Sequence, residues 1–173
     1  VLSTNEAEPY ALKNKTYALE CLERYEEVLD YCDKILSIDN RDTWALNSKG
    51  LALNNLDRHE DALTLYDISL EIEPENTTAL INKANTLAFL NDYPEAIEFY
   101  DKAQTIDPQI KELAVAKSRE FKKLGLEDEA FLAAQGVLLQ DMEKIKSDAK
   151  ENKCSVFHQF CQIEFEENKS KTQ

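Results

Sequence analysis

A 34-residue period runs through the chain and constrains its fold more than any other feature. Pro74 and Pro108 stand one period apart. Other apolar positions recur in the same register: Leu22, Leu56, Leu90 and Leu124; Val28, Ala62, Ala96 and Ala130; and Ile38, Ile72 and Ile106. A fixed period of this length is typical of arrays in which each repeat is one supersecondary unit. The chain is therefore predicted to consist of stacked copies of one small motif.

Each repeat has the pattern of two helices joined by a short turn. Ala62, Tyr66 and Ser69 follow the spacing i, i+4, i+7, which places them on one stripe of a helix. Asp42 and Asn76 stand just before the first helix of their repeats and are expected to cap it. Only 3 of the 173 residues are glycine, which argues against β-rich folds and phosphate-binding loops, because both need residues that tolerate positive φ. An all-α fold follows.

These units resemble tetratricopeptide repeats. The family's small residue, alanine, aromatic residue and proline match Gly50, Ala62, Tyr66 and Pro74 in the second repeat, and Ala84, Ala96, Tyr100 and Pro108 in the third. The first repeat departs from the pattern with Thr16, Val28, Cys32 and Asn40, and the fourth keeps Gly125 and Ala130 but loses the closing proline. The resemblance implies an all-α fold, an α-solenoid of stacked helix-turn-helix hairpins with a C-terminal capping helix.

The repeat register divides the chain into segments. We expect a flexible N-terminus (1–8), repeats at 9–42, 43–76 and 77–110, a degenerate repeat (111–142), a C-terminal helical extension or cap (143–165) and a disordered tail (166–173). The second helix of the fourth repeat is expected to run from Glu127 to about Lys150. The sequence leaves open whether the aromatic C-terminal segment caps the array or occupies its groove.

In the repeat family, the first helix of each hairpin lines a concave groove. The positions that match this surface and form the predicted peptide groove are Tyr10, Lys13, Asn14, Tyr17, Trp44, Asn47, Ser48, Leu51, Asn54, Asn55, Thr78, Ile81, Asn82, Asn85 and Phe89. Lys13 and Glu20 are the charged residues of the helix surfaces that face the groove, so we expect a neutral groove rich in asparagine. A carboxamide can donate to a peptide carbonyl and accept from the adjacent N–H. The pattern predicts a non-catalytic protein–protein interaction module that binds an extended or short helical peptide segment of another protein.

The family's two-carboxylate clamp for chaperone tails is incomplete here. Lys13 matches its first lysine, but Tyr17, Ser48 and Asn82 stand where the clamp has other polar or basic residues. Charge-assisted capture of a carboxylate needs such cations, so no chaperone-tail adaptor function is expected.

Two charged series repeat with the same period. Lysines occur at Lys15, Lys49, Lys83 and Lys117, and aspartates at Asp33, Asp67 and Asp101. We interpret them as structural ion pairs in which the lysine stem lies along a neighbouring helix and the ammonium reaches an exposed carboxylate. Pairs of this kind contribute about 0–1 kcal/mol each.

Other classes of function receive little support from the sequence. Cys154, His158 and Cys161 would share one face of a helix and form a weak candidate zinc site that lacks a fourth ligand. No catalytic arrangement is visible, so we expect no enzyme and no cofactor. The net charge of −14 disfavours nucleic acid, no apolar run is long enough for membrane insertion, and the few cysteines point to a cytoplasmic protein. A self-assembling scaffold or homo-oligomer, using acidic outer faces or the C-terminal helix, and a metal-binding protein remain alternatives.

Overall fold

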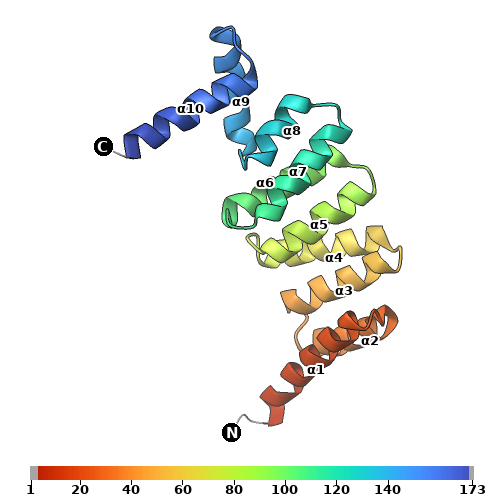
Figure 1. Ribbon diagram of the computed structural model, residues 1–173. Coiled ribbons are helices and arrows are strands. Elements are labelled where there is room, and N and C mark those ends of the chain that lie inside the picture. Colours follow the sequence, from red (N-terminus) through yellow and green to blue (C-terminus); the bar gives the residue numbers. More distant parts are fainter. Residues whose placement is uncertain (1–3, 172–173) are drawn as a thin grey trace. The chain divides into compact units, whose positions relative to one another are not determined.

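The computed structural model describes residues 4–171 and the side chains of residues 9–170. It contains ten α-helices and no strand within residues 4–171 (Figure 1), so the expected all-α class is confirmed. The chain forms two compact units, residues 1–90 and 91–173. No helix in the described range combines the length and apolar character that a membrane crossing requires.

The first unit is a series of helices that pack on their neighbours in the chain. Its helices are α1 (Thr4–Cys21), α2 (Tyr25–Ile38), α3 (Thr43–Asn55), α4 (His59–Ile72) and α5 (Thr77–Phe89). Each helix contacts the next, and the first helices of successive hairpins also touch, α1 with α3 and α3 with α5. This order is that of stacked helical hairpins, and it places α1, α3 and α5 on one side of the unit.

Side-chain caps begin two of these helices, as the sequence predicts. Asp42 accepts a hydrogen bond from the Ala45 N–H at 3.0 Å, and Asn76 accepts one from the Ala79 N–H at 3.0 Å. Each cap satisfies one backbone donor that the first turn of a helix leaves without a partner.

The turn between the two helices of each hairpin uses a left-handed backbone at the same repeat position. Glu23, Asp57, Asn91 and Gly125 have φ values of 57°, 59°, 67° and 75°. A side chain in this region costs about 1–2 kcal/mol because Cβ approaches the following carbonyl oxygen. Gly125 alone among the four has no Cβ and escapes this cost.

We expect Gly125→Ala to lower the free energy of unfolding by about 1 kcal/mol, because the backbone cost is partly offset by lower entropy of the unfolded chain. A Cβ at Gly125 would meet no atom within 4 Å, so steric crowding by neighbours contributes nothing. Urea unfolding measures the effect. Gly125→Asn serves as the control, since asparagine tolerates this backbone better; an alanine variant as stable as the parent would contradict the prediction.

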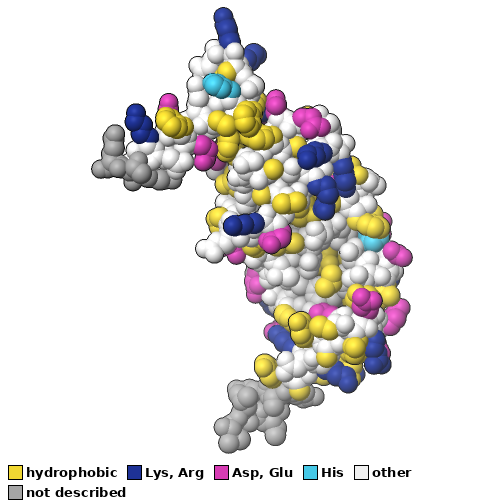
Figure 2. Space-filling view, viewed as in Figure 1, with side chains coloured by type: hydrophobic (Ala, Val, Ile, Leu, Met, Phe, Trp, Pro, Cys, Tyr) yellow, Lys and Arg dark blue, Asp and Glu magenta, His cyan; other side chains and the backbone are white. Residues whose placement is uncertain are grey.

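The second unit comprises α6 (Tyr93–Ile106), α7 (Lys111–Lys123), α8 (Glu127–Ala134), α9 (Leu139–Glu151) and α10 (Val156–Lys171). Met142, Ile145 and Ala149 of α9 join residues of α6, α7 and α8 in one hydrophobic cluster. Phe131 of α8 also packs against Phe157 and Phe160 of α10, with ring centroids 5.2 and 5.7 Å apart. Figure 2 shows hydrophobic side chains gathered near this C-terminal hairpin. The apolar faces of α9 and α10 are thus partly buried within their own unit.

The expected long helix from Glu127 to Lys150 is wrong. The structure ends α8 at Ala134, places Gly136 at φ +83° and starts α9 at Leu139. Contacts from other helices hold this break: Gln104 donates to the Gly136 carbonyl at 2.7 Å, and the Leu139 N–H donates to Asp101 at 3.1 Å. Glycine tolerates the left-handed backbone that such a break requires.

The chain ends also differ from the expectation. The structure starts α1 at Thr4, inside the segment expected to be flexible (1–8), and residues 1–3 lie outside the described range. Residues 166–171, expected in the disordered tail (166–173), belong to α10, and residues 172–173 are not described. No glycine or proline interrupts the chain after Val156, so nothing local ends the helix earlier. The expected extension (143–165) corresponds to parts of α9 and α10.

Candidate functional site

Side chains of α1, α3 and α5 line a pocket of about 290 Å³ in the first unit. We call it the Trp44 pocket, and it is lined by Tyr17, Glu20, Thr43, Trp44, Asn47, Ser48, Leu51, Asn76, Thr78 and Asn82. Seven of the predicted groove residues meet here: Tyr17, Trp44, Asn47, Ser48, Leu51, Thr78 and Asn82. They converge because α3 lies in contact with both α1 and α5.

Asn47 is the most constrained side chain of the Trp44 pocket. It is only 5% exposed, and its amide nitrogen donates to Asn76 Oδ1 at 3.2 Å. That Asn76 oxygen also accepts the Ala79 N–H, which fixes it as an acceptor and so fixes the orientation of the Asn47 amide. Asn47 Oδ1 is then left buried without a hydrogen-bond partner. A buried acceptor without a partner is costly, so this oxygen is suited to receive a donor from a ligand.

Glu20 brings a carboxylate into the same pocket. Its Oε1 atom is buried and has no hydrogen-bond partner. Burial raises the pKa of Glu20 above its ordinary value of 4.5, and a hydrogen bond from the Ser48 side chain opposes part of that rise. The Trp44 pocket therefore holds two unpartnered acceptor oxygens, one from Glu20 and one from Asn47.

Lys13 does not balance the charge of Glu20. Its ammonium lies 2.6 Å from Asp42 and 5.5 Å from the centroid of the Trp44 ring, and it does not line the Trp44 pocket. Glu20 is consequently the charged residue that lines the pocket. Lys13, the other charged residue of the predicted groove, is instead paired with Asp42.

The raised pKa of Glu20 has a consequence for stability. Because the folded state binds this proton more tightly than the unfolded chain does, the carboxyl costs stability as the pH rises through its raised pKa. We expect Glu20→Gln to raise the unfolding temperature at pH 7.5 and to change it little at pH 4, where the parent carboxyl is largely protonated. Thermal unfolding at both pH values measures this, and Glu26→Gln, at an exposed position of α2, is the control. A variant less stable than the parent at pH 7.5 would contradict the prediction.

The remaining predicted groove residues lie outside the Trp44 pocket. Asn54 accepts from or donates to His59 Nδ1 at 2.7 Å, and the His59 ring packs on Phe89 with centroids 4.7 Å apart. Asn55 donates to the Leu51 carbonyl of its own helix at 2.8 Å. Ile81 is half-buried, whereas Tyr10, Asn14 and Asn85 are exposed. Two of the predicted ligand-binding amides, Asn54 and Asn55, are thus occupied by contacts within the protein.

Three residues of the pocket are absent from the predicted peptide groove: Glu20, which the sequence analysis placed on the groove-facing surface, and Thr43 and Asn76. Thr43 and Asn76 line the pocket, although Asn76 was expected only to cap α5. They lie at helix starts, outside the part of the helix from which the groove positions were derived. The side chain of Asn76 both caps α5 and lines the pocket, and no sequence pattern indicates the second role.

The structure does not assemble the candidate zinc site. Cys154 lies before α10, so it does not share a helical face with His158 and Cys161. Its thiol instead contacts Gln159 Oε1 at 3.6 Å, and His158 and Cys161 are exposed. Among the described residues, no group of three His, Cys, Asp or Glu side chains is placed to hold a metal ion.

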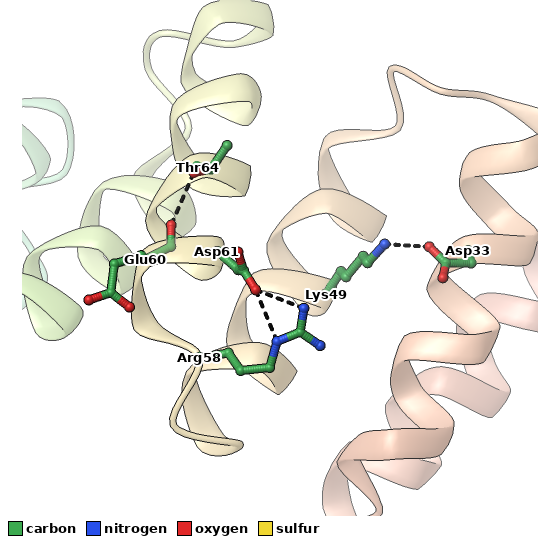
Figure 3. A network of polar contacts seen from close by, with 6 residues as sticks. All are labelled: Asp33, Lys49, Arg58, Glu60, Asp61 and Thr64. Atoms are coloured by element: carbon green, nitrogen blue, oxygen red, sulfur yellow. Dashed lines mark hydrogen bonds and ion pairs between the residues drawn. The ribbon is translucent and has the colours of Figure 1, made fainter.

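Three of the four periodic lysines form the predicted ion pairs with the periodic aspartates, whereas the ammonium of Lys15 lies 5.9 Å from the centroid of the Tyr31 ring. Lys49 reaches Asp33 at 2.5 Å, Lys83 reaches Asp67 at 2.6 Å, and Lys117 reaches Asp101 at 2.5 Å. Figure 3 shows the first pair between α3 and α2, with the pair between Arg58, just before α4, and Asp61 of α4 beside it. The third pair differs from the expectation of exposed pairs: the Lys117 side chain is 0% exposed and that of Asp101 15%, against 25% and 60% for Lys49 and Asp33.

Comparisons with known proteins agree with the fold. The family model of the tetratricopeptide repeat matches residues 78–110. The crystal structure of MamA is 16% identical with a TM-score of 0.69, and the match covers 81% of this chain and 81% of that one. The first TPR of Spaghetti (RPAP3), bound to the HSP90 peptide SRMEEVD, is 17% identical with a TM-score of 0.64 over 68% of this chain and 93% of that one. The Arabidopsis OM64 TPR domain is 19% identical with a TM-score of 0.63 over 68% and 98%.

Comparison with curated proteins gives no significant sequence match. The solved structures share the helical-hairpin fold, and the family model identifies one repeat in the sequence itself. The chain therefore contains a tetratricopeptide repeat at residues 78–110 and shares the fold of solved tetratricopeptide-repeat domains.

Proposed function

We propose that this chain is a non-catalytic interaction module that binds a peptide segment of another protein over α1, α3 and α5, with the Trp44 pocket at the centre. The observation that carries the proposal is the buried Asn47 oxygen, which lines the pocket and has no partner. A peptide N–H or a side-chain donor would satisfy it. That a structural neighbour is bound to a peptide, SRMEEVD, supports the same class of function.

The pocket can be tested through Trp44, which is the only tryptophan of the chain. We expect peptides selected from a displayed random library to change Trp44 fluorescence when they bind. Asn82→Ala, within the pocket, should weaken them by about tenfold or more. Asn40→Ala is the control, because Asn40 is exposed in the connection between α2 and α3 and belongs neither to the predicted groove nor to the pocket. Peptides that bind both variants equally and leave the fluorescence unchanged would refute the proposal.

The acidic peptide of the structural neighbour is not expected to be a ligand. Three of the last four residues of SRMEEVD are acidic, whereas the Trp44 pocket presents the Glu20 carboxylate and Lys13 is paired with Asp42. Like charges at close range oppose binding. We therefore expect SRMEEVD to leave Trp44 fluorescence unchanged.

A second candidate function is self-assembly through α10. Phe157 and Phe165 on this helix are 59% and 71% exposed, and large apolar side chains at the surface can mark an interaction site. Light scattering over a concentration series tests this, and Phe165→Ser should reduce any association found. A chain that remains monomeric at every concentration would exclude it.

The proposal includes a cytoplasmic location and no catalytic, cofactor-dependent or nucleic-acid-binding role. A net charge of −14 supports the last point, because nucleic-acid binding depends on the release of counterions by cationic side chains.

A further inference from the structure

We propose that the Trp44 pocket binds a guanidinium group, presented by an arginine side chain of the bound peptide segment. This inference rests on the proposed function and names the chemistry of its ligand. It is carried by three features of the pocket: the unpartnered acceptor oxygens of Glu20 and Asn47, the charge of Glu20, and the aromatic side chains that line the pocket.

The charge of the pocket favours a cation. Glu20 is the charged residue among those that line it, and its Oε1 is buried without a partner. Lys13, the other charged residue of the predicted groove surface, lies 2.6 Å from Asp42 instead. A cationic ligand would give the Glu20 carboxylate the charged hydrogen-bond partner that the protein does not supply.

The second acceptor has a fixed direction. Asn47 is 95% buried, since only 5% of it is exposed, and its amide nitrogen is held by Asn76 Oδ1 at 3.2 Å. The amide cannot be turned to offer its nitrogen to a ligand, because Asn76 Oδ1 is itself fixed by the Ala79 N–H. A ligand of this pocket therefore needs hydrogen-bond donors that reach both Glu20 and Asn47. An ionised carboxylate ligand has no such donor.

A guanidinium suits two separated acceptors better than an ammonium does. It carries five N–H donors in a planar fork, and its faces stack on aromatic rings. Tyr17, 64% exposed, and Trp44, whose ring already lies 5.5 Å from the Lys13 ammonium, supply such rings at the pocket. A volume of about 290 Å³ lies just below the range of about 300–1,000 Å³ for small-molecule sites, which is consistent with one inserted side chain.

The test uses the intact 173-residue chain and a displayed library of random peptides. Arginine is expected to be enriched at one position of the peptides whose binding depends on Asn82. Replacing that arginine by citrulline, which keeps the shape and removes the charge, should weaken binding about 10- to 100-fold. Lysine should bind with intermediate affinity and glutamate should abolish binding.

Glu20→Gln provides the decisive variant, because it keeps the shape of the side chain and is expected to leave the fold at least as stable. It should remove the preference for arginine over citrulline, whereas Glu26→Gln on the exposed face of α2 should retain it. Peptides that need Asn82 but show no preference for arginine, or a preference that survives Glu20→Gln, would overturn this inference and leave the proposed function standing. The absence of any peptide that depends on Asn82 would overturn both.

Discussion

Asp101→Ala is expected to lower the free energy of unfolding by about 3–5 kcal/mol, because it would leave the Lys117 ammonium buried without a counter-charge. Lys117 is 0% exposed, and its other recorded contact is the Val137 carbonyl at 3.2 Å. Asp101 also accepts the Leu139 N–H at the start of α9. The substitution therefore removes the counter-charge of Lys117 and also the hydrogen bond that holds the start of α9. Urea unfolding measures the total loss in the free energy of unfolding, and hydrogen exchange of the amides near Leu139 measures the local loss of stability at the start of α9.

The protein supplies a matched control for this variant. Asp33 pairs with Lys49 at the same repeat positions and at the same 2.5 Å, but its side chain is 60% exposed. Asp33→Ala should cost only about 0–1 kcal/mol, since water replaces the lost partner. In the double variant Asp101→Ala with Lys117→Met, part of the stability should return, because no buried charge remains. Equal, small costs for Asp101→Ala and Asp33→Ala would show that burial does not set the strength of these pairs.

Gly50→Leu is expected to destabilise the protein by about 1–3 kcal/mol through overpacking. A Cβ placed on Gly50 would lie 2.5 Å from Cε1 of Tyr66, and Tyr66 is 0% exposed, so its ring has no free space beside it. On an isolated helix, the replacement of glycine would instead gain about 1 kcal/mol in helix propensity. The close approach of α3 and α4 thus reverses the sign of the effect, which thermal or urea unfolding measures.

The first hairpin suggests how this loss can be rescued. At the positions of Gly50 and Tyr66 it carries Thr16 and Cys32, both buried, and Thr16 satisfies its hydroxyl on the Leu12 carbonyl at 2.9 Å. We expect Gly50→Thr to be destabilising and the added change Tyr66→Cys to recover part of the loss, because the larger residue then faces a smaller one. Additive losses in the double variant would mean that the two positions do not share one space.

The candidate site was only partly predictable from the sequence. The repeat positions placed Trp44, Asn47 and Asn82 on one surface, and the structure puts all three around the Trp44 pocket. The repeat positions did not show that these three residues line the pocket whereas Asn54 does not, because the side chain of Asn54 is hydrogen-bonded to His59. Helical periodicity predicts the side of a helix from which a residue projects, whereas a hydrogen bond depends on which neighbour lies within about 3 Å.

The sequence by itself determined the helical hairpins, the caps at Asp42 and Asn76, and the ion pairs that three of the four periodic lysines make with the periodic aspartates. These features depend on spacing along the chain, and a regular repeat converts spacing directly into position. Only the tertiary structure decided that Lys117 is buried, that Gly136 breaks the last repeat, and that Lys13 turns to Asp42 and leaves Glu20 unpaired. Burial and choice of partner are set by side chains from other helices, which no local pattern in the sequence specifies.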